Sequence, residues 1–240
     1  MSFYVTLPSD SSSKFFPGNK ISHFITQLPK SINLSGEWEV GLSEVIYKHS
    51  WYNINESNND FTYDIGDGKT VRKELPPGSY ESTIDIIRAL TLAVPSGKFY
   101  FSLNENTKKV KIQVVKGASI RFGSGLSNLL GFRNEKIEGT VQSPNVADPC
   151  AEFSFFYIYA DIVAPQIVGE IQAPLLRIVK VEGRNNEVIS HNYDRPHYVP
   201  IVRNNFQTIE IQSRLHTGGL VPFERGQVIV VLHFRMRQIL

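Results

Sequence analysis

Two histidines and an aspartate lie within one short polar stretch, Ser190-His191-Asn192-Tyr193-Asp194-Arg195-Pro196-His197. Imidazole and carboxylate groups together suit several divalent metals. The spacing of His191, Asp194 and His197, however, places them on no common face of a strand or a helix. We therefore interpret both histidines as solvated residues of a loop, and we predict neither a metal site nor a cofactor.

The other patterns that could support catalysis are incomplete. A nucleophile elbow requires Gly-x-Ser-x-Gly, and the segment Gly125-Leu126-Ser127-Asn128-Leu129 lacks the final glycine. A dinucleotide-binding fingerprint has the pattern Gly-x-Gly-x-x-Gly. The segment that begins with Gly123-Ser124-Gly125 has Asn128 in place of the third glycine, so we interpret this segment as a turn. His233 alternates with apolar residues and should point to the opposite face of a strand. We assign no catalytic residue and predict that the chain is not an enzyme, although an active site scattered over several strands is an alternative.

Aromatic side chains offer a different kind of chemistry, the stacking of a sugar ring in a groove. The aromatic residues in question are Trp38, Trp51, Phe153, Phe155, Phe156, Tyr157 and Tyr159. Aromatics at alternating strand positions are more typical of a core or a subunit interface. Because the strand around residues 153–163 is apolar on both faces, we expect it to be covered by a helix, the N-terminal segment or a neighbouring subunit.

The charge balance does not indicate a nucleic-acid-binding protein. The chain has 25 basic and 23 acidic residues among 240, a formal net charge of +2. Its densest basic run comprises Lys108, Lys109, Lys111 and Lys116, which alternate with apolar residues as on the solvated face of a strand. We predict no specific binding of nucleic acid. A hydrophobic fraction of 41% is sufficient for a substantial core.

The single cysteine, Cys150, excludes an intramolecular disulfide and suggests assembly in a reducing compartment. The N-terminal residues lack the basic and apolar regions of a secretory signal. The longest apolar runs are shorter than the roughly 20 residues that a membrane-spanning helix requires. We expect a soluble protein that is made inside the cell, is not secreted and does not span a membrane.

Alternation of apolar and polar residues recurs along the chain and predicts an all-β fold. Eight principal strands are expected near residues 37–47, 61–72, 99–103, 110–115, 153–163, 175–181, 206–213 and 227–236. Many short strands separated by turn residues favour a sandwich, and eight is the number that a jelly-roll contains. We predict an eight-stranded single jelly-roll sandwich with an N-terminal arm and two short helices in connections between strands.

The two helices are expected near residues 82–94 and 125–130. Ser82 and Asp85 form a capping-box pattern, and Gly131 stands where a left-handed cap prefers glycine. If the strands are lettered B to I, the helices fall in the C–D and E–F connections, at one end of the sandwich. The short segment 104–108 could instead form a plain hairpin, which would break this lettering.

The domain organisation follows from the same pattern. We expect residues 1–36 to form an N-terminal arm or extra strand, and residues 37–240 to form one jelly-roll domain that contains the helical insertions. The polar stretch 182–205 would be the G–H connection. Deletion of residues 2–34 would then weaken assembly and leave the sandwich folded.

Several blocks of sequence, spread over nearly the whole chain, carry a family resemblance. They are Phe3-Tyr4-Val5-Thr6-Leu7-Pro8-Ser9, Phe16-Pro17-Gly18-Asn19, Leu34-Ser35-Gly36-Glu37-Trp38, His49-Ser50-Trp51-Tyr52-Asn53-Ile54, Leu75-Pro76-Pro77-Gly78-Ser79-Tyr80, Leu126-Ser127-Asn128-Leu129-Leu130-Gly131-Phe132, Pro174-Leu175-Leu176-Arg177, Phe223-Glu224-Arg225-Gly226 and Leu232-His233-Phe234-Arg235. In order and spacing they resemble the penton (minor capsid) proteins of Polinton or Maverick elements and adintovirus-like viruses. Asp10 and Lys48 depart from the pattern, where asparagine and proline are expected.

The resemblance implies a structural virion protein, a single jelly-roll that forms homopentamers at the five-fold vertices of an icosahedral capsid. Its implied neighbours are double jelly-roll major capsid proteins, and a vertex fibre or spike is a further partner. The alternative is a jelly-roll recognition module, such as a receptor-binding spike head or a lectin. That alternative predicts an exposed aromatic and polar groove, at Trp51-Tyr52-Asn53 or at Thr217-Gly218-Gly219. No binding residue is assigned.

Overall fold

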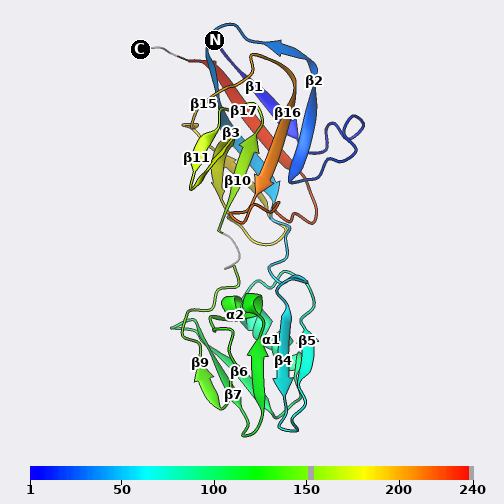
Figure 1. The fold of residues 1–240 in the computed structure, drawn as a ribbon, viewed down its shortest axis with the longest axis vertical. Helices are drawn as coiled ribbons and strands as arrows, with labels where there is room; N and C mark the ends of the chain where they lie inside the picture. The colour runs from blue at the N-terminus through cyan, green and yellow to red at the C-terminus, as the bar shows by residue number, and fades with distance from the viewer. Residues whose placement is uncertain (151–153, 238–240) are drawn as a thin grey trace. The chain divides into compact units, whose positions relative to one another are not determined.

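The computed structural model describes residues 1–150 and 154–237, and it divides the chain into two compact units. The first unit comprises Met1–Trp51 and Phe153–Leu240, and the second comprises Tyr52–Glu152 (Figure 1). The second unit is therefore inserted into the sequence of the first. This differs from the expected single domain over residues 37–240, because the segment between the two halves of the first unit builds a hydrophobic core of its own.

The first unit consists mainly of two antiparallel sheets. In the first sheet the strand order is β1 (Ser2–Pro8), β17 (Val228–Met236), β3 (Trp38–Lys48) and β14 (Val188–Asn192), and the short β15 (Val199–Pro200) also pairs with β3. In the second sheet the order is β13 (Leu175–Lys180), β10 (Phe155–Ala160), β16 (Asn205–Arg214) and β2 (His23–Asn33).

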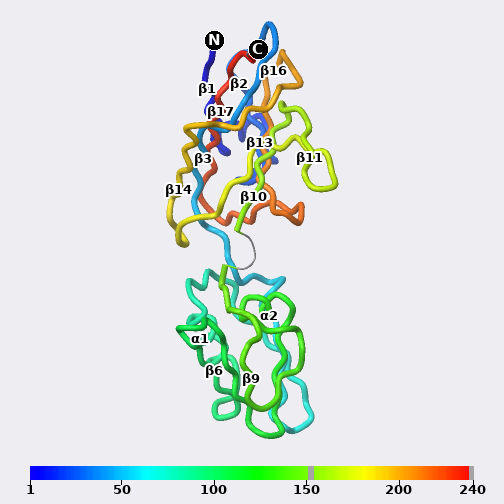
Figure 2. Tube along the Cα trace, turned by 90° about the vertical axis from the view of Figure 1, so that its left-hand side faces the viewer, coloured from blue at the N-terminus to red at the C-terminus, as the bar shows by residue number. Residues whose placement is uncertain are grey.

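These strand orders are those of a jelly-roll. When β1, β2, β3, β10, β13, β14, β16 and β17 are lettered B to I in chain order, the first sheet reads B-I-D-G and the second reads C-H-E-F. The predicted eight-stranded jelly-roll is thus confirmed. The first unit also contains a two-stranded hairpin between β10 and β13, formed by β11 (Gln166–Val168) and β12 (Ile171–Ala173), which projects from the sandwich in Figure 2.

The inward faces of the two sheets form the jelly-roll core. Strand alternation brings Leu232 and Phe234 of β17 against Phe156 of β10 and Ile211 of β16 within one buried cluster, and all four are fully buried. The Phe234 ring also stacks on Phe3 of β1, with ring centroids 4.9 Å apart. Each fully buried large apolar side chain stabilises the folded state by about 1.5–3 kcal/mol relative to exposure.

The segment 1–36, expected as an N-terminal arm or an extra strand, supplies two of the eight jelly-roll strands. In β1, all seven residues pair with β17, and Leu7 is fully buried. In β2, Phe24 is fully buried and Leu28 nearly so. The alternation of Phe3, Val5 and Leu7 is the pattern of a half-buried strand.

Three expected jelly-roll strands belong instead to the second unit, and the G strand was missed. The segments expected at 61–72, 99–103 and 110–115 lie within Tyr52–Glu152. The stretch 182–205, expected as a connection, contains β14 and β15, an edge strand with a polar sequence and a two-residue strand. Both helices therefore lie in the D–E connection, not in C–D and E–F.

The second unit combines two three-stranded sheets and two helices. One sheet has the order β5 (Val71–Glu74), β4 (Asp60–Asp64), β8 (Ser119–Phe122), and the other has β6 (Phe99–Asn104), β7 (Lys109–Val114), β9 (Thr140–Gln142). The helices are α1 (Thr83–Ala93) and α2 (Ser124–Leu130). The plain hairpin considered for residues 104–108 is present, since β6 and β7 pair with Asn104 opposite Lys109.

Both predicted helix boundaries are confirmed. The Ser82 side chain accepts a hydrogen bond from the Asp85 backbone N–H, and the Asp85 carboxylate accepts one from Ser82, so the capping box is complete. Gly131 ends α2 with φ of 75°, and a Cβ at that position would collide with the backbone of Asn145. Glycine is required there because it has no Cβ.

Candidate functional site

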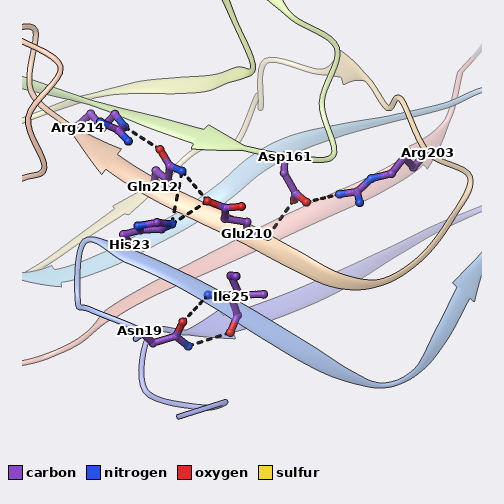
Figure 3. A network of polar contacts seen from close by, with 8 residues as sticks. All are labelled: Asn19, His23, Ile25, Asp161, Arg203, Glu210, Gln212 and Arg214. Carbon is purple, nitrogen blue, oxygen red and sulfur yellow. Dashed lines mark hydrogen bonds and ion pairs between the residues drawn. The ribbon is translucent and has the colours of Figure 1, made fainter. Parts of the chain in front are cut away.

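A network of polar side chains crosses the outer face of the second sheet (Figure 3). On β16, Glu210, Gln212 and Arg214 point outward because they alternate with the buried Ile209, Ile211 and Ser213. Gln212 Nε2 donates to Glu210 Oε1 at 2.5 Å, and Arg214 Nε donates to Gln212 Oε1 at 2.7 Å. From β2, His23 Nε2 lies 2.7 Å from the same Glu210 oxygen.

Two further contacts fix this network in place. The Glu210 backbone N–H donates to Asp161 Oδ1 at 2.9 Å, and Asp161 Oδ2 is paired with Arg203. At the beginning of β2, the Asn19 amide donates to the Ile25 carbonyl at 2.9 Å and accepts from the Ile25 N–H at 3.0 Å. These bonds hold the edge strand that carries His23, so the charged groups are oriented before any ligand arrives.

The electrostatics of the network centre on Glu210. Burial raises the pKa of the Glu210 carboxyl group. The hydrogen bonds from Gln212 and His23 and the positive charge of Arg214 lower this pKa by more than burial raises it, so the net pKa lies below its ordinary value. Glu210 is therefore a fixed carboxylate at neutral pH.

Two tyrosines form an aromatic surface beside the network. In the pairing of β10 with β16, Tyr159 lies opposite Gln212 and Tyr157 lies opposite Arg214. The two tyrosine rings are nearly parallel, with an interplanar angle of 19° and centroids 6.4 Å apart. Burial and the neighbouring Tyr157 raise the pKa of Tyr159, so its hydroxyl stays protonated at neutral pH.

Tyr159 and part of the network line one hollow of about 360 Å³. It is lined by Tyr159, Asp161, Ile171, Ala173, Pro174, Glu210, Gln212, Arg214 and Gly218. An aromatic ring, a carboxylate and a guanidinium at one hollow are suited to recognition of a polar ligand. Within the part of the chain that the structure describes, no three or more His, Cys, Asp or Glu side chains are placed to hold a metal ion.

The structure separates the two histidines of the 190–197 stretch. His191 lies on the edge strand β14 and is half-buried, with its ring 5.9 Å from that of Tyr47 and its Nε2 3.4 Å from Tyr47 Oη. It is thus a packed strand residue, and its interpretation as a solvated loop residue was wrong. His197 and Asp194 are exposed. Burial raises the pKa of Tyr47 to about 12.

His233 lies on the outer face of the first sheet, opposite to the buried side chains of Leu232 and Phe234, as predicted. Its Nδ1 is 2.7 Å from Tyr198 Oη, and its ring stacks on Tyr4 at 4.4 Å. Burial and the nearby Arg235 lower the pKa of His233.

The aromatic residues divide between core and surface. Trp38, Trp51 and Phe156 are buried in the jelly-roll core, as the core interpretation expects. Phe155 is half exposed, and Tyr157 and Tyr159 lie at the outer face. Phe153 lies outside the described residues.

The two groove positions expected of a recognition module differ in their outcome. Trp51 is buried, and the Asn53 amide is used internally, donating to the carbonyls of Tyr80 and Pro149 at 2.9 and 2.7 Å. Gly218, in contrast, lines the hollow beside Arg214, whose Nη1 donates to the Gly218 carbonyl. The alternation of Glu210, Gln212 and Arg214 with buried residues was visible in the sequence, but their approach to His23 depends on the pairing of β2 with β16.

The remaining motifs have structural roles. On β7, Lys109 and Lys111 flank the fully buried Val110, and Lys111 is exposed, as expected for the solvated face of a strand. Gly123 is the N-cap of α2, and Gly125 lies within its first turn. No helix within the described residues is long and apolar enough to cross a membrane.

The B-I-D-G and C-H-E-F sheets, with a second unit inserted between strands D and E, define the class of the protein as a single jelly-roll with a large D–E insertion. A solved structure of this kind is the crystal structure of the mavirus penton protein, which covers 98% of this chain and 99% of its own with a TM-score of 0.57. The two sequences are 13% identical, so the likeness is one of fold. The resemblance indicated by the sequence blocks is confirmed at that level. No protein-family profile and no curated protein sequence matches the chain.

Proposed function

We propose that this chain is a structural, non-enzymatic virion protein of penton type, which forms homopentamers at the five-fold vertices of an icosahedral capsid. The observation that carries the proposal is the extent of the fold likeness, which spans 98% of this chain and 99% of the mavirus penton protein. The likeness therefore includes the inserted second unit as well as the jelly-roll, which is itself common to many unrelated proteins.

Five-fold closure requires two different surfaces of each subunit to meet around the ring. A stable interface of this kind buries at least about 1,000 Å². The β11–β12 hairpin offers apolar surface for it near its tip, since Ile167 is 81% exposed. Phe155 on β10 and Ile178 on β13 are about half exposed. In the pairing of the two strands, Phe155 lies opposite Lys180 and Ile178 lies opposite Tyr157.

The expected partners follow from the same proposal. They are further copies of the chain, a double jelly-roll major capsid protein around the vertex, and a vertex fibre or spike. The protein would act in the virion through shape and buried area, without a cofactor.

The first test is the solution mass of the purified protein by light scattering, with negative-stain images of the same peak. We expect a ring of five subunits. A trimer would contradict the proposal and favour a receptor-binding spike head. A stable monomer would require the same measurement on particles assembled with the major capsid protein, where absence from the vertices would also contradict it.

The variant Ile167→Asp tests the hairpin as a contact. It places a charge on an apolar residue that a neighbouring subunit would bury, so we expect the pentamer to dissociate while the fold persists. The matched control is Leu92→Asp, at an 87% exposed position on α1 of the second unit. A pentamer that survives Ile167→Asp would exclude the hairpin tip from the interface.

A further inference from the structure

We infer that the hollow beside Tyr159 is a binding site for a neutral saccharide. It lies between the E–F hairpin, represented by Ile171 and Ala173, and the turn that contains Gly218, with β10 and β16 beneath it. Its volume of about 360 Å³ falls within the range of about 300–1,000 Å³ typical of small-ligand pockets. The inference is independent of the capsid proposal, because residues of a single chain form the whole hollow.

The apolar part of the site suits a sugar ring. Tyr159 presents a half-buried aromatic ring, and Ala173 and Pro174 add apolar surface at the same hollow. One face of a pyranose carries mainly C–H groups, which pack against an aromatic ring. Tyrosine combines this apolar surface with a polar hydroxyl that can bind a sugar hydroxyl.

The polar part supplies both donors and acceptors in fixed positions. Glu210 uses Oε1 for His23 and Gln212, and Arg214 uses Nε for Gln212 and Nη1 for the Gly218 carbonyl. Glu210 Oε2, Arg214 Nη2 and Tyr159 Oη have no hydrogen-bond partner among residues 1–150 and 154–237. Sugar hydroxyls both donate and accept, and so they match a carboxylate, a guanidinium and a phenol held together. Because the network holds these groups beforehand, binding orders few side chains.

The charges at the hollow favour an uncharged ligand. Asp161 is paired with Arg203, and Glu210 is bonded to His23 and lies near Arg214. The guanidinium of Arg214 already has two hydrogen bonds to the protein, and two carboxylates border the same hollow. Two carboxylates and one guanidinium line the hollow, so a phosphate or a carboxylate would meet more acidic than basic groups there. A hydroxyl-rich neutral molecule carries no charge for them to repel.

The test is titration of the full-length protein by isothermal calorimetry and saturation-transfer NMR. The probes are lactose, maltose, cellobiose and N,N′-diacetylchitobiose, with 3′-sialyllactose and inorganic phosphate as charged comparisons. We expect at least one neutral disaccharide to bind saturably, with a Kd of about 1 mM or tighter. Tyr159→Ala should weaken that binding at least about 10-fold, because the stacking surface is lost.

Two other variants make the test specific. Ile171→Trp places a larger side chain at an exposed position of β12 that lines the hollow, and it should abolish binding. This variant provides the test if Tyr159→Ala does not fold. Tyr100→Ala removes a 53% exposed tyrosine from β6 of the second unit and should leave affinity unchanged. Failure of all four neutral disaccharides to saturate at about 10 mM would overturn the inference. So would binding that survives Ile171→Trp, or binding confined to 3′-sialyllactose or phosphate.

Discussion

His23 and Glu210 are 187 positions apart in the sequence, yet His23 Nε2 lies 2.7 Å from Glu210 Oε1. The contact follows from the antiparallel pairing of β2 with β16, in which His23 lies opposite Gln212 and Ile25 lies opposite Glu210. It joins the N-terminal segment of the chain to the H strand of the jelly-roll. The N-terminal segment is thus an integral part of the second sheet and supplies His23, one partner of this hydrogen bond, to the candidate site.

Deletion of residues 2–34 is therefore expected to unfold the jelly-roll unit. It removes β1 and β2, with Leu7 and Phe24 from the core, and leaves β17 and β16 without their outer partners. Loss of even one such side chain costs about 2–5 kcal/mol, and a whole domain is stable by only about 5–15 kcal/mol. Far-UV circular dichroism and thermal unfolding would measure the loss. The control Phe15→Ser changes a 69% exposed residue of the same segment and should preserve the transition. A cooperatively folded deletion variant would disprove this prediction.

The pKa of Glu210 predicts a loss of stability in acid. A carboxyl group with a lowered folded pKa stabilises the native state above its ordinary value of 4.5, and that contribution disappears as the pH falls through the folded value. Glu210→Gln should lower the stability of the jelly-roll unit by about 1 kcal/mol at neutral pH, since the hydrogen bonds to a charged acceptor are partly screened. The corresponding change in Tm is about 2–4 °C.

The pH dependence distinguishes this effect from a general loss of packing. The difference in Tm between wild type and Glu210→Gln should shrink as the pH falls through the acid range, because both then carry a neutral side chain. Glu224→Gln, at an exposed position, is the control and should follow the wild-type curve. A difference in Tm that is constant with pH would show that the carboxylate charge is not responsible.

His49 should make the stability of the jelly-roll unit depend on pH in a higher pH range than Glu210 does. Burial lowers its pKa from the ordinary 6.5, against the opposing hydrogen bond to the Glu182 carbonyl at 3.2 Å, and its ring stacks on Trp51 at 3.9 Å. The neutral imidazole is therefore favoured in the folded state. Its contribution to stability is complete above pH 6.5 and is lost as the pH falls through the lowered pKa of the folded state. His49→Phe keeps the ring and should flatten the stability curve below that pH. NMR titration of the wild-type ring should give a pKa below 6.5. The variant His216→Phe, in an exposed turn, should leave the slope unchanged.

The fold class could be predicted because it depends on patterns that each strand carries by itself. Alternation in β3, β16 and β17 and the capping box at Ser82 are local, and each is found where the sequence placed it. The assignment of strands to sheets could not be predicted, because the inserted unit contributes strands with the same alternation. The eight strands expected from the sequence included three that belong to the inserted unit. They did not include β1, β2 and β14, which are jelly-roll strands in the structure.

The missed strands each have a physical reason. In β2 the inward position between Phe24 and Leu28 is occupied by the polar Thr26, and Pro29 interrupts the pattern, as proline does at sheet edges. β14 is an edge strand whose sequence, Val-Ile-Ser-His-Asn, is largely polar and exposed. The candidate site could not be predicted from the sequence for a related reason. Its tyrosines, carboxylates and arginine come from β10, β16 and the segments beside them, and only the sheet register brings them together.

The inserted unit should fold when residues 52–150 are produced alone. Its buried cluster, which includes Phe61, Ile86, Leu90 and Phe122, lies entirely within that range. We expect a dispersed NMR spectrum and a cooperative thermal transition. On α1, Leu90 is fully buried and Leu92 is 87% exposed, so the two leucines form a matched pair. Leu90→Ala should destabilise the isolated unit by about 2–5 kcal/mol. Leu92→Ala should change its stability by less than about 0.5 kcal/mol. An isolated unit without a cooperative transition, or equal effects of the two substitutions, would show that this core depends on the jelly-roll for its stability.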